Sequence, residues 1–169
     1  MKFYKVVAVA VMALWACGAA AEGRIAVFDV EAAVLNTDMA KKRLTDMRNQ
    51  AEYKKNVSEL ESLKKKYDKV VEQFQKDFDI LSAEQRQATK NKIDAARADG
   101  EHIARKIESA NQQEAQSILQ ELGPKLQAIL PQLVKDENIG LLLPRKAVLH
   151  ADSSYDITAK VADKLNNAK

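Results

Sequence analysis

The feature that most constrains this chain is a long stretch that contains almost no helix breaker. Between Asp38 and Glu121 there is a single glycine, Gly100, and no proline. Strands in globular proteins are typically about 5 or 6 residues long and are separated by turns rich in glycine and proline. A breaker-poor stretch of this length therefore predicts long helices and argues against a sheet protein.

Apolar residues recur along the stretch at steps of three and four, which places them in a narrow stripe on one side of a helix. The first stripe consists of Tyr53, Val57, Leu60, Leu63, Tyr67, Val70, Phe74, Phe78 and Leu81. The second is built from smaller residues: Ile93, Ala96, Gly100, Ile103, Ile107 and Ala110. Small residues opposite large ones let two helices approach closely, so we expect the two stripes to pack against each other in an antiparallel hairpin.

The turn of this hairpin is marked by a helix-start signal. Ser82 is followed three residues later by Gln85, which is the spacing of a capping box. At ~36 residues per arm, each arm is on the order of 55 Å long. A globular helical bundle is the alternative, but its helices would normally carry wider apolar faces.

The two ends of the chain carry the β-strand signals. Residues 24–30 (RIAVFDV) read as a strand, a short helix over 31–35 should follow, and we expect Asp38 to cap the first long helix. Near the other end, Gly123-Pro124 is predicted to break or kink the returning helix.

Residues 140–149 read as two short strands around a turn at Pro144-Arg145-Lys146. A final helix should begin at 156–158 and present Ile157, Val161 and Leu165 on one side.

The predicted fold is therefore α+β and mainly α. It has a helical-hairpin arm over residues 38–122 and a small β/α body built from 22–37 and 123–169. A sheet of about three strands cannot bury both of its faces, so we expect the bodies of several copies to associate. The residues expected to form this oligomerisation body are Ile25, Val27, Val30, Leu141, Leu143, Val148 and Ile157.

Residues 1–21 resemble an export signal. Lys2 and Lys5 precede an apolar run over 6–16, and Ala19-Ala20-Ala21 fits a signal-peptidase site, which predicts cleavage before Glu22. The alternative is a lipidated Cys17, although the preceding residues 14–16 (LWA) only loosely resemble a lipoprotein box. Cleavage before Glu22 also removes the one cysteine, so the exported chain would form no disulfide.

No motif of enzyme chemistry occurs in the chain. Its two histidines, His102 and His150, are too few for a histidine-rich metal site, and phosphate loops, nucleophile elbows and zinc-protease motifs are missing. We therefore predict neither catalysis nor a cofactor or metal. Nucleic-acid binding is not expected either, because no pattern of aromatic and basic residues supports base stacking.

Basic residues gather around the predicted hairpin turn. Removing the export signal takes away two basic residues and no acidic one, leaving the chain at about +1. The turn region alone carries eight basic against five acidic residues. Such an excess would attract acidic clients or an anionic membrane surface, whereas the alternative is a solvated coiled-coil face. The candidate client-binding residues are Lys64, Lys65, Lys66, Lys69, Lys76, Arg86, Lys90 and Lys92.

The start of the predicted first strand (IAVFDV, 25–30), the charged hairpin with Leu81-Ser82 at its turn, and the closing YDIT (155–158) together resemble the Skp/OmpH family of periplasmic chaperones. The resemblance implies a homotrimer whose terminal strands form a small β-barrel body. It implies that three arms enclose a cavity that holds unfolded outer-membrane proteins without ATP.

Two alternatives stay open at this stage. Some members of the family bind lipopolysaccharide through basic residues on the arm, but no such cluster can be matched here residue by residue. Anionic membrane or lipopolysaccharide is thus an open partner of the basic residues. The other function is structural, in an exported coiled-coil protein that bridges envelope layers or is anchored through Cys17.

Overall fold

The computed structural model describes residues 23–168 and confirms the α+β, mainly α fold class. The predicted export signal and Cys17 lie outside these residues. In chain order the elements are β1 (Arg24–Phe28), α2 (Val30–Leu35), α3 (Asp38–Asn49), α4 (Ala51–Asp77), α5 (Ala83–Asp136), β2 (Ile139–Pro144), the 3₁₀ turns η1 (Arg145–Ala147) and η2 (Ser153–Tyr155), and α6 (Thr158–Asn167).

The chain divides into two compact units, which are described separately. The hairpin unit comprises Val34–Pro124, and the terminal unit comprises the described residues through Ala33 together with those from Lys125 onward. The terminal unit thus joins the two ends of the chain.

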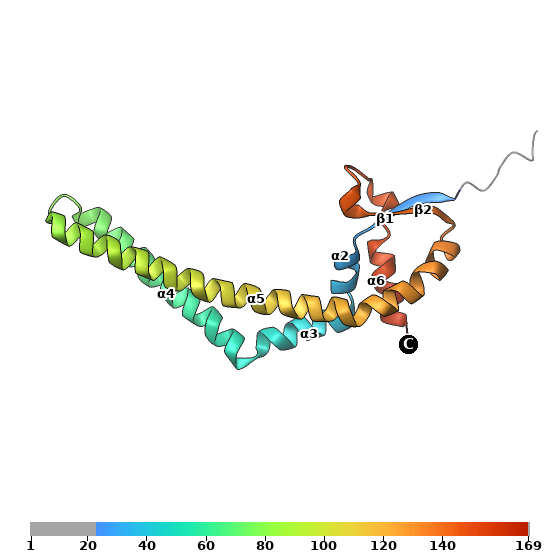
Figure 1. Cartoon of the computed structure of the whole chain (residues 1–169), viewed down its shortest axis with the longest axis horizontal. Coiled ribbons are helices and arrows are strands. Elements are labelled where there is room, and N and C mark those ends of the chain that lie inside the picture. Colours follow the sequence, from blue (N-terminus) through green and yellow to red (C-terminus); the bar gives the residue numbers. More distant parts are fainter. Residues whose placement is uncertain (1–22, 169) are drawn as a thin grey trace, which may run out of the picture. The chain divides into compact units, whose positions relative to one another are not determined.

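In the hairpin unit, α4 runs alongside α5 and the two helices are joined by a tight turn (Figure 1). The predicted capping box closes this turn. The backbone N–H of Gln85 donates to Ser82 Oγ at 3.2 Å, and the N–H of Ser82 donates to Gln85 Oε1 at 2.9 Å. Both groups would otherwise be unpaired donors at the start of α5, so the reciprocal pair explains why the helix begins there.

The apolar stripes form the seam of the hairpin, but they are only partly covered. Ile103 is buried, whereas most of the other stripe residues are half-buried and Phe78 is exposed. None of the 27 residues of α4 is buried. The seam of this unit is consequently thin, as expected for two helices that pack along a narrow stripe.

The first arm is divided in two at Gln50, a feature that the apolar spacing did not predict. Gln50 has φ −61° and ψ 143°, an extended conformation that ends α3 and precedes α4. The N–H of Gln50 donates to the carbonyl of Met47 at 3.1 Å, and the Gln50 carbonyl accepts from the N–H of Lys54 at 3.1 Å. These two bonds pair the N–H and the carbonyl of Gln50 at the junction. The break between the helices therefore forms without a glycine or a proline.

On the α3 side of the junction, the side chain of Arg43 connects α3 to α5. The guanidinium of Arg43 donates to Glu114 at 2.8 Å, to Glu121 at 2.6 Å and to Ser117 Oγ at 3.1 Å. These three acceptors lie on one side of α5, so the planar fork of Arg43 bridges the two helices along about two turns. Arg43 therefore sets the position of α3 on α5.

The residue that caps α3 is Thr37, and the prediction that Asp38 does so is wrong. Thr37 Oγ1 accepts from the N–H of Ala40 at 3.2 Å and donates to the carbonyl of Val34 at 2.7 Å. Asp38 instead occupies the first turn of the helix. Thr37 is the better cap because its side chain is only 2% exposed and one hydroxyl satisfies both backbone groups.

Replacing Thr37 with valine is expected to destabilise the protein by ~1–3 kcal/mol, because valine keeps the shape but leaves the buried N–H of Ala40 unpaired, while the Val34 carbonyl keeps only its bond from the backbone N–H of residue 37. Urea denaturation followed by circular dichroism measures the change. Thr45→Val is the matched control, since Thr45 is exposed and its hydroxyl bonds only to the Lys41 carbonyl. Equal effects of the two substitutions would contradict this role of Thr37.

In the terminal unit, β1 and β2 form a parallel two-stranded sheet although they come from opposite ends of the chain. Arg24 pairs with Ile139 and Ile25 pairs with Leu141, so Gly140 is an extra residue on β2, as in a β-bulge. On its other side, β1 is met by a single bridge between Val27 and Asp156. In this bridge the N–H of Ile157 donates to the Val27 carbonyl at 2.9 Å.

The prediction of two strands within 140–149 is wrong. One strand, β2, ends at Pro144, and the 3₁₀ turn η1 follows where the second strand should start. Val148 lies after this turn, outside any strand. The turn at Pro144 was correctly located, but the chain after it continues into η1 and does not pair with β2, whose other edge has no partner strand among residues 23–168.

Gly123-Pro124 was predicted to break or kink the returning helix, and a break does not occur. The helix α5 continues through both residues to Asp136. A proline removes one backbone donor, but the neighbouring i→i−4 hydrogen bonds can carry a helix past it.

The final helix was predicted correctly. Ile157, Val161 and Leu165 are all buried, at 2%, 0% and 4% exposed. Of the other residues expected in the oligomerisation body, Val27 is buried and Leu143 and Val148 are half-buried. Ile25, Val30 and Leu141 are exposed. The exposed ones are therefore not used by the core of a single copy.

Candidate functional site

The eight predicted basic residues all lie in the hairpin unit, but they differ in what they contact. Lys64, Lys65, Lys66, Lys69 and Lys76 are on α4, whereas Arg86, Lys90 and Lys92 are on α5. Every one of them except Arg86 is exposed. Lys76 is paired with Glu72 at 2.6 Å, and none of the other exposed lysines forms an ion pair within residues 23–168. Six lysines thus remain available to a partner.

Arg86 supports the turn and is not a free cation. Its guanidinium lies over the ring of Phe78 at 4.3 Å from the ring centre, and its Nε is buried without a hydrogen-bond partner. Phe78 in turn packs edge-to-face on Phe74, with 5.4 Å between ring centres. Such a cation–π contact stabilises the turn, so Arg86 belongs to the structure of the hairpin end.

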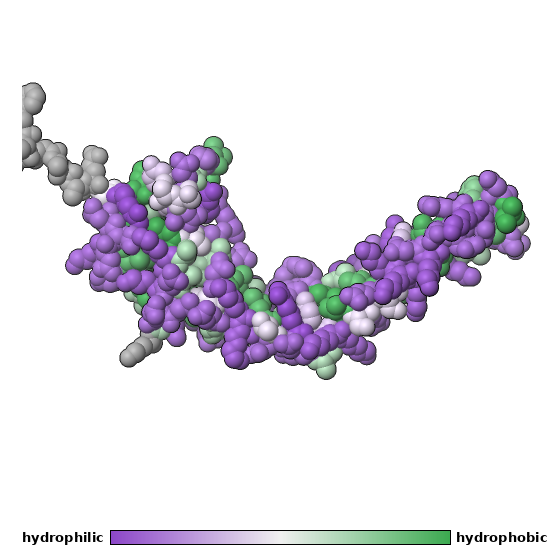
Figure 2. All heavy atoms as spheres, turned by 180° about the vertical axis from the view of Figure 1, so that it is seen from behind, coloured by the Kyte–Doolittle hydropathy of each residue, from purple (hydrophilic) through white to green (hydrophobic). Residues whose placement is uncertain are grey.

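The very end of the hairpin exposes two large apolar side chains next to the exposed Asp79. Ile80 is 83% exposed and Phe78 is 41% exposed, whereas the predicted basic residues lie on either side of this turn along the two helices. Figure 2 shows hydrophobic atoms at the end of an otherwise largely hydrophilic hairpin. The predicted basic residues therefore flank a turn that also exposes apolar side chains.

A groove of about 400 Å³ lies between the helices near this end and brings two of the predicted lysines together. Val70, Phe74 and Leu81 supply its apolar surface, and Lys69 and Lys92 face it from α4 and α5. Its other lining residues are Gln73, Asp77 and Thr89. An apolar surface flanked by two ammonium groups can hold an apolar segment that also carries a carboxylate.

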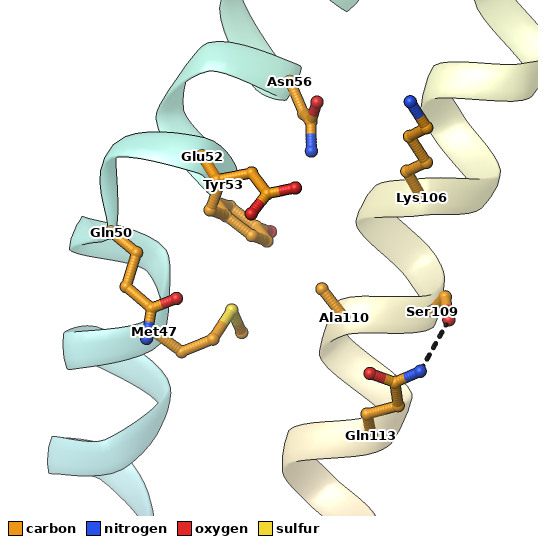
Figure 3. A pocket seen from close by; sticks show the side chains of 9 residues that line it. All are labelled: Met47, Gln50, Glu52, Tyr53, Asn56, Lys106, Ser109, Ala110 and Gln113. Carbon is orange, nitrogen blue, oxygen red and sulfur yellow. Dashed lines mark hydrogen bonds between the residues drawn. The ribbon is translucent and has the colours of Figure 1, made fainter.

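A second pocket, of about 360 Å³, lies beside the junction at Gln50 (Figure 3). Met47 and Tyr53 line it from the first arm, and Ala110 and Gln113 line it from α5. Gln50, Glu52, Asn56, Lys106 and Ser109 complete its wall. Sequence reasoning missed this pocket; the one available signal is the step of six residues between Met47 and Tyr53, which is not a helical repeat.

The charged groups of the terminal unit are organised into ion pairs between the end of α5 and α6. Lys160 Nζ donates to Glu137 at 2.6 Å, and Arg24 donates to the same carboxylate oxygen at 2.7 Å. Lys164 Nζ donates to Asp136 at 3.2 Å. The hydrogen bond from Lys160 lowers the pKa of Glu137, and hydrogen bonds from Gln132 and Lys164 lower the pKa of Asp136.

These shifts predict that the terminal unit weakens in acid. Because the folded pKa values lie below the ordinary 4.5 of Glu137 and 3.8 of Asp136, stability is present above these values and is lost as the pH falls through them. We expect the melting temperature to decrease between about pH 5 and pH 3. Glu137→Gln should decrease less over this range, and an equal decrease in both proteins would contradict the assignment.

The described residues hold no grouping typical of a metal site. No cluster of three or more His, Cys, Asp or Glu able to hold a metal ion occurs among residues 23–168. His102 is exposed on α5, and His150 contacts only Asp152, at 3.2 Å. No helix in this part of the chain is long and apolar enough to cross a bilayer.

The chain thus combines a long helical hairpin unit with a small α/β unit. The family model of outer membrane protein (OmpH-like) matches residues 24–165. The chain therefore belongs to the OmpH-like family, a family of periplasmic chaperones of outer membrane proteins.

Among solved structures, the chain is similar to one from Caulobacter crescentus CB15 that is assigned as an outer membrane chaperone (OmpH-like). The sequence identity is 18% and the TM-score 0.45, over 86% of this chain and 85% of that chain. No curated protein gives a significant match.

Proposed function

We propose that this protein is an ATP-independent holdase that binds unfolded outer-membrane proteins between its helical hairpins and prevents their aggregation. The precursors of membrane β-barrels expose apolar strands that aggregate in water. Many weak contacts to such strands hold them without committing them to one conformation. Release then requires no energy source.

The observation that carries the proposal is the incomplete burial of the hairpin seam. A 27-residue helix with no buried residue offers half-covered apolar side chains along its whole length. A seam meant only to hold two helices together would gain by covering these side chains. Exposed lysines beside the seam add long-range attraction for acidic segments of a client.

Within the hairpin we assign client contact chiefly to the groove between Lys69 and Lys92, with Lys64, Lys65, Lys66 and Lys90 attracting the client electrostatically. Lys76 and Arg86 contribute less, because each already has a partner in the hairpin. Anionic membrane or lipopolysaccharide is the alternative partner of the same lysines. Competition between lipopolysaccharide and an unfolded client for the protein distinguishes the two.

We further propose that the terminal units of three copies associate. Five large apolar side chains of this unit are at least 43% exposed: Ile25, Val30, Leu141, Leu149 and Tyr155. The strand β2 is apolar and pairs only with β1 in the described part of the chain. An apolar strand with an open edge is a site for pairing with another copy. The number three follows the family, and sedimentation analysis measures it.

An aggregation assay tests the holdase proposal. An outer-membrane β-barrel protein unfolded in urea is diluted into buffer with and without a threefold subunit excess of this protein, and light scattering is followed. We expect scattering to be suppressed in the absence of ATP. An equal concentration of a soluble protein without chaperone activity is the control, and undiminished scattering would overturn the proposal.

The proposed location is the periplasm, with cleavage before Glu22. Mass spectrometry of the protein purified from cells tests this directly. A free amino terminus at Glu22 supports a soluble chaperone, whereas a lipid on Cys17 supports an anchored envelope protein.

A further inference from the structure

The pocket beside the α3–α4 junction is a second binding site in the hairpin, separate from the groove between Lys69 and Lys92. We propose that it takes an aromatic side chain from an extended segment of an unfolded polypeptide. The inference rests on the proposed holdase function and deepens it by naming the part of the client that is recognised.

The size of the pocket limits what can enter it. Its volume of about 360 Å³ corresponds to a cube roughly 7 Å on a side, whereas a helix with its side chains is ~10–12 Å across. A folded helix is therefore too wide. One large side chain on an extended backbone fits this space.

The inner lining of the pocket favours a ring over an aliphatic side chain. Met47 contributes a thioether, and sulfur makes favourable contacts with ring edges. Tyr53 contributes an aromatic face, and aromatic pairs attract each other beyond their burial alone. Lys106 lines the opposite wall from α5, with its ammonium group toward Asn56 (Figure 3). Two groups that prefer aromatic partners, Met47 and Tyr53, thus lie together on the first arm's side of the pocket.

The rim of the pocket offers unsatisfied hydrogen-bonding groups. The side chains of Gln50 and Asn56 make no hydrogen bond within residues 23–168, and Glu52 and Lys106 form no ion pair there. Amide side chains both donate and accept, so they can pair with the N–H and C=O groups of a passing peptide backbone whatever its sequence. The rim can therefore bind the backbone of an extended client segment, and the lining favours an aromatic side chain of that segment.

The pocket exists because the first arm is divided. On the α3 side of the junction, Arg43 connects α3 to α5. On the α4 side, Tyr53 Oη donates to Asn111 Oδ1 of α5 at 3.4 Å. The junction at Gln50 lies between these two attachments and leaves Met47 and Tyr53 apart from Ala110. An unbroken first helix would carry its side chains past Ala110 at regular spacing and would leave no comparable room.

The experiment uses the two methionines in the described residues, Met39 and Met47, both on α3. The protein, purified from the periplasm, is labelled with ¹³C at the methionine methyl groups, and the signal of Met47 is assigned from a Met47→Leu variant. The probes are a synthetic extended peptide with alternating tyrosine and threonine and the same peptide with leucine in place of tyrosine.

We expect the tyrosine peptide to shift the Met47 methyl signal upfield and saturably, because a ring would lie against it, while the Met39 signal stays in place. Ala110→Leu, which fills the pocket from α5, should weaken binding of this peptide about tenfold. The matched control is Ala104→Leu, because Ala104 is exposed on the same helix and lies outside the pocket. It should change the affinity less than about twofold.

A second variant guards against loss of the hairpin in Ala110→Leu. Asn56→Ala removes one rim amide that has no bond to lose, and it should weaken the tyrosine peptide about threefold. An equal Met47 shift with the leucine peptide overturns the aromatic assignment. Suppressed aggregation of an unfolded barrel protein with an unmoved Met47 signal overturns the pocket proposal and leaves the holdase standing. Undiminished aggregation overturns both.

Discussion

Replacing Gly140 with valine is expected to disrupt the pairing of β1 and β2 and to destabilise the terminal unit by ~3 kcal/mol. A Cβ at this position would lie 2.8 Å from the carbonyl oxygen and 3.0 Å from the Cα of Gly23. Both of these are backbone atoms, so no side chain can turn aside to make room. Gly140 is also the extra residue of the strand pairing, which brings the two backbones close.

The effect of Gly140→Val is measured by urea denaturation and by the molar mass in solution. If the terminal units associate as we propose, the variant should lose its assembled form together with its stability. Gly100→Ala is the control, because a Cβ at Gly100 meets no atom within 4 Å and alanine is the better helix former. A fully stable, fully assembled Gly140→Val protein would contradict the close approach.

Reversing the charges of the groove, as Lys69→Glu together with Lys92→Glu, is expected to weaken the binding of an acidic unfolded client by about tenfold or more at low salt. Two attractive charges next to the apolar surface become repulsive, while the fold keeps its contacts because neither lysine forms an ion pair in the described residues. The difference from the unsubstituted protein should shrink at high salt, where charges are screened. Fluorescence anisotropy of a labelled client measures the affinity.

The matched control is Lys54→Glu with Lys55→Glu, which makes the same change of net charge on α4. Both lysines are exposed and neither lines the groove. If the two double variants weaken the client equally, the net charge of the hairpin and not the groove accounts for the attraction.

Much of the hairpin could be predicted because its signals are local. The spacing of the apolar residues and the pair Ser82 and Gln85 each act within one or two helical turns, so they specify helices wherever the chain carries them. The final helix was predicted for the same reason, through Ile157 and Val161.

The errors share a different cause. Asp38 and Thr37 are both good caps, and the choice between them depends on which side chain is buried against Val34 and Ala40. The second strand expected before residue 149 is absent because the chain after Pro144 enters the 3₁₀ turn η1 and does not pair with β2. Strand propensity does not decide whether a segment pairs with its neighbour, because that depends on the tertiary context.

The candidate site could be predicted only in part. The lysines around the turn were found from charge alone, but charge did not show that Arg86 is held over Phe78 or that Lys76 is paired. The pocket near Gln50 was not found, because an extended residue without glycine or proline leaves little trace in a pattern of apolar residues.

By itself, the amino-acid sequence determined that the middle of this protein forms a helical hairpin that turns back at Ser82, since caps and periodicity act over a few residues. Only the tertiary structure decided that Arg24 meets Glu137, that Lys69 and Lys92 share a groove, and where the first arm divides. These features depend on contacts between residues that are far apart in the chain. Such contacts stabilise the protein only after the backbone has folded and brought the residues together.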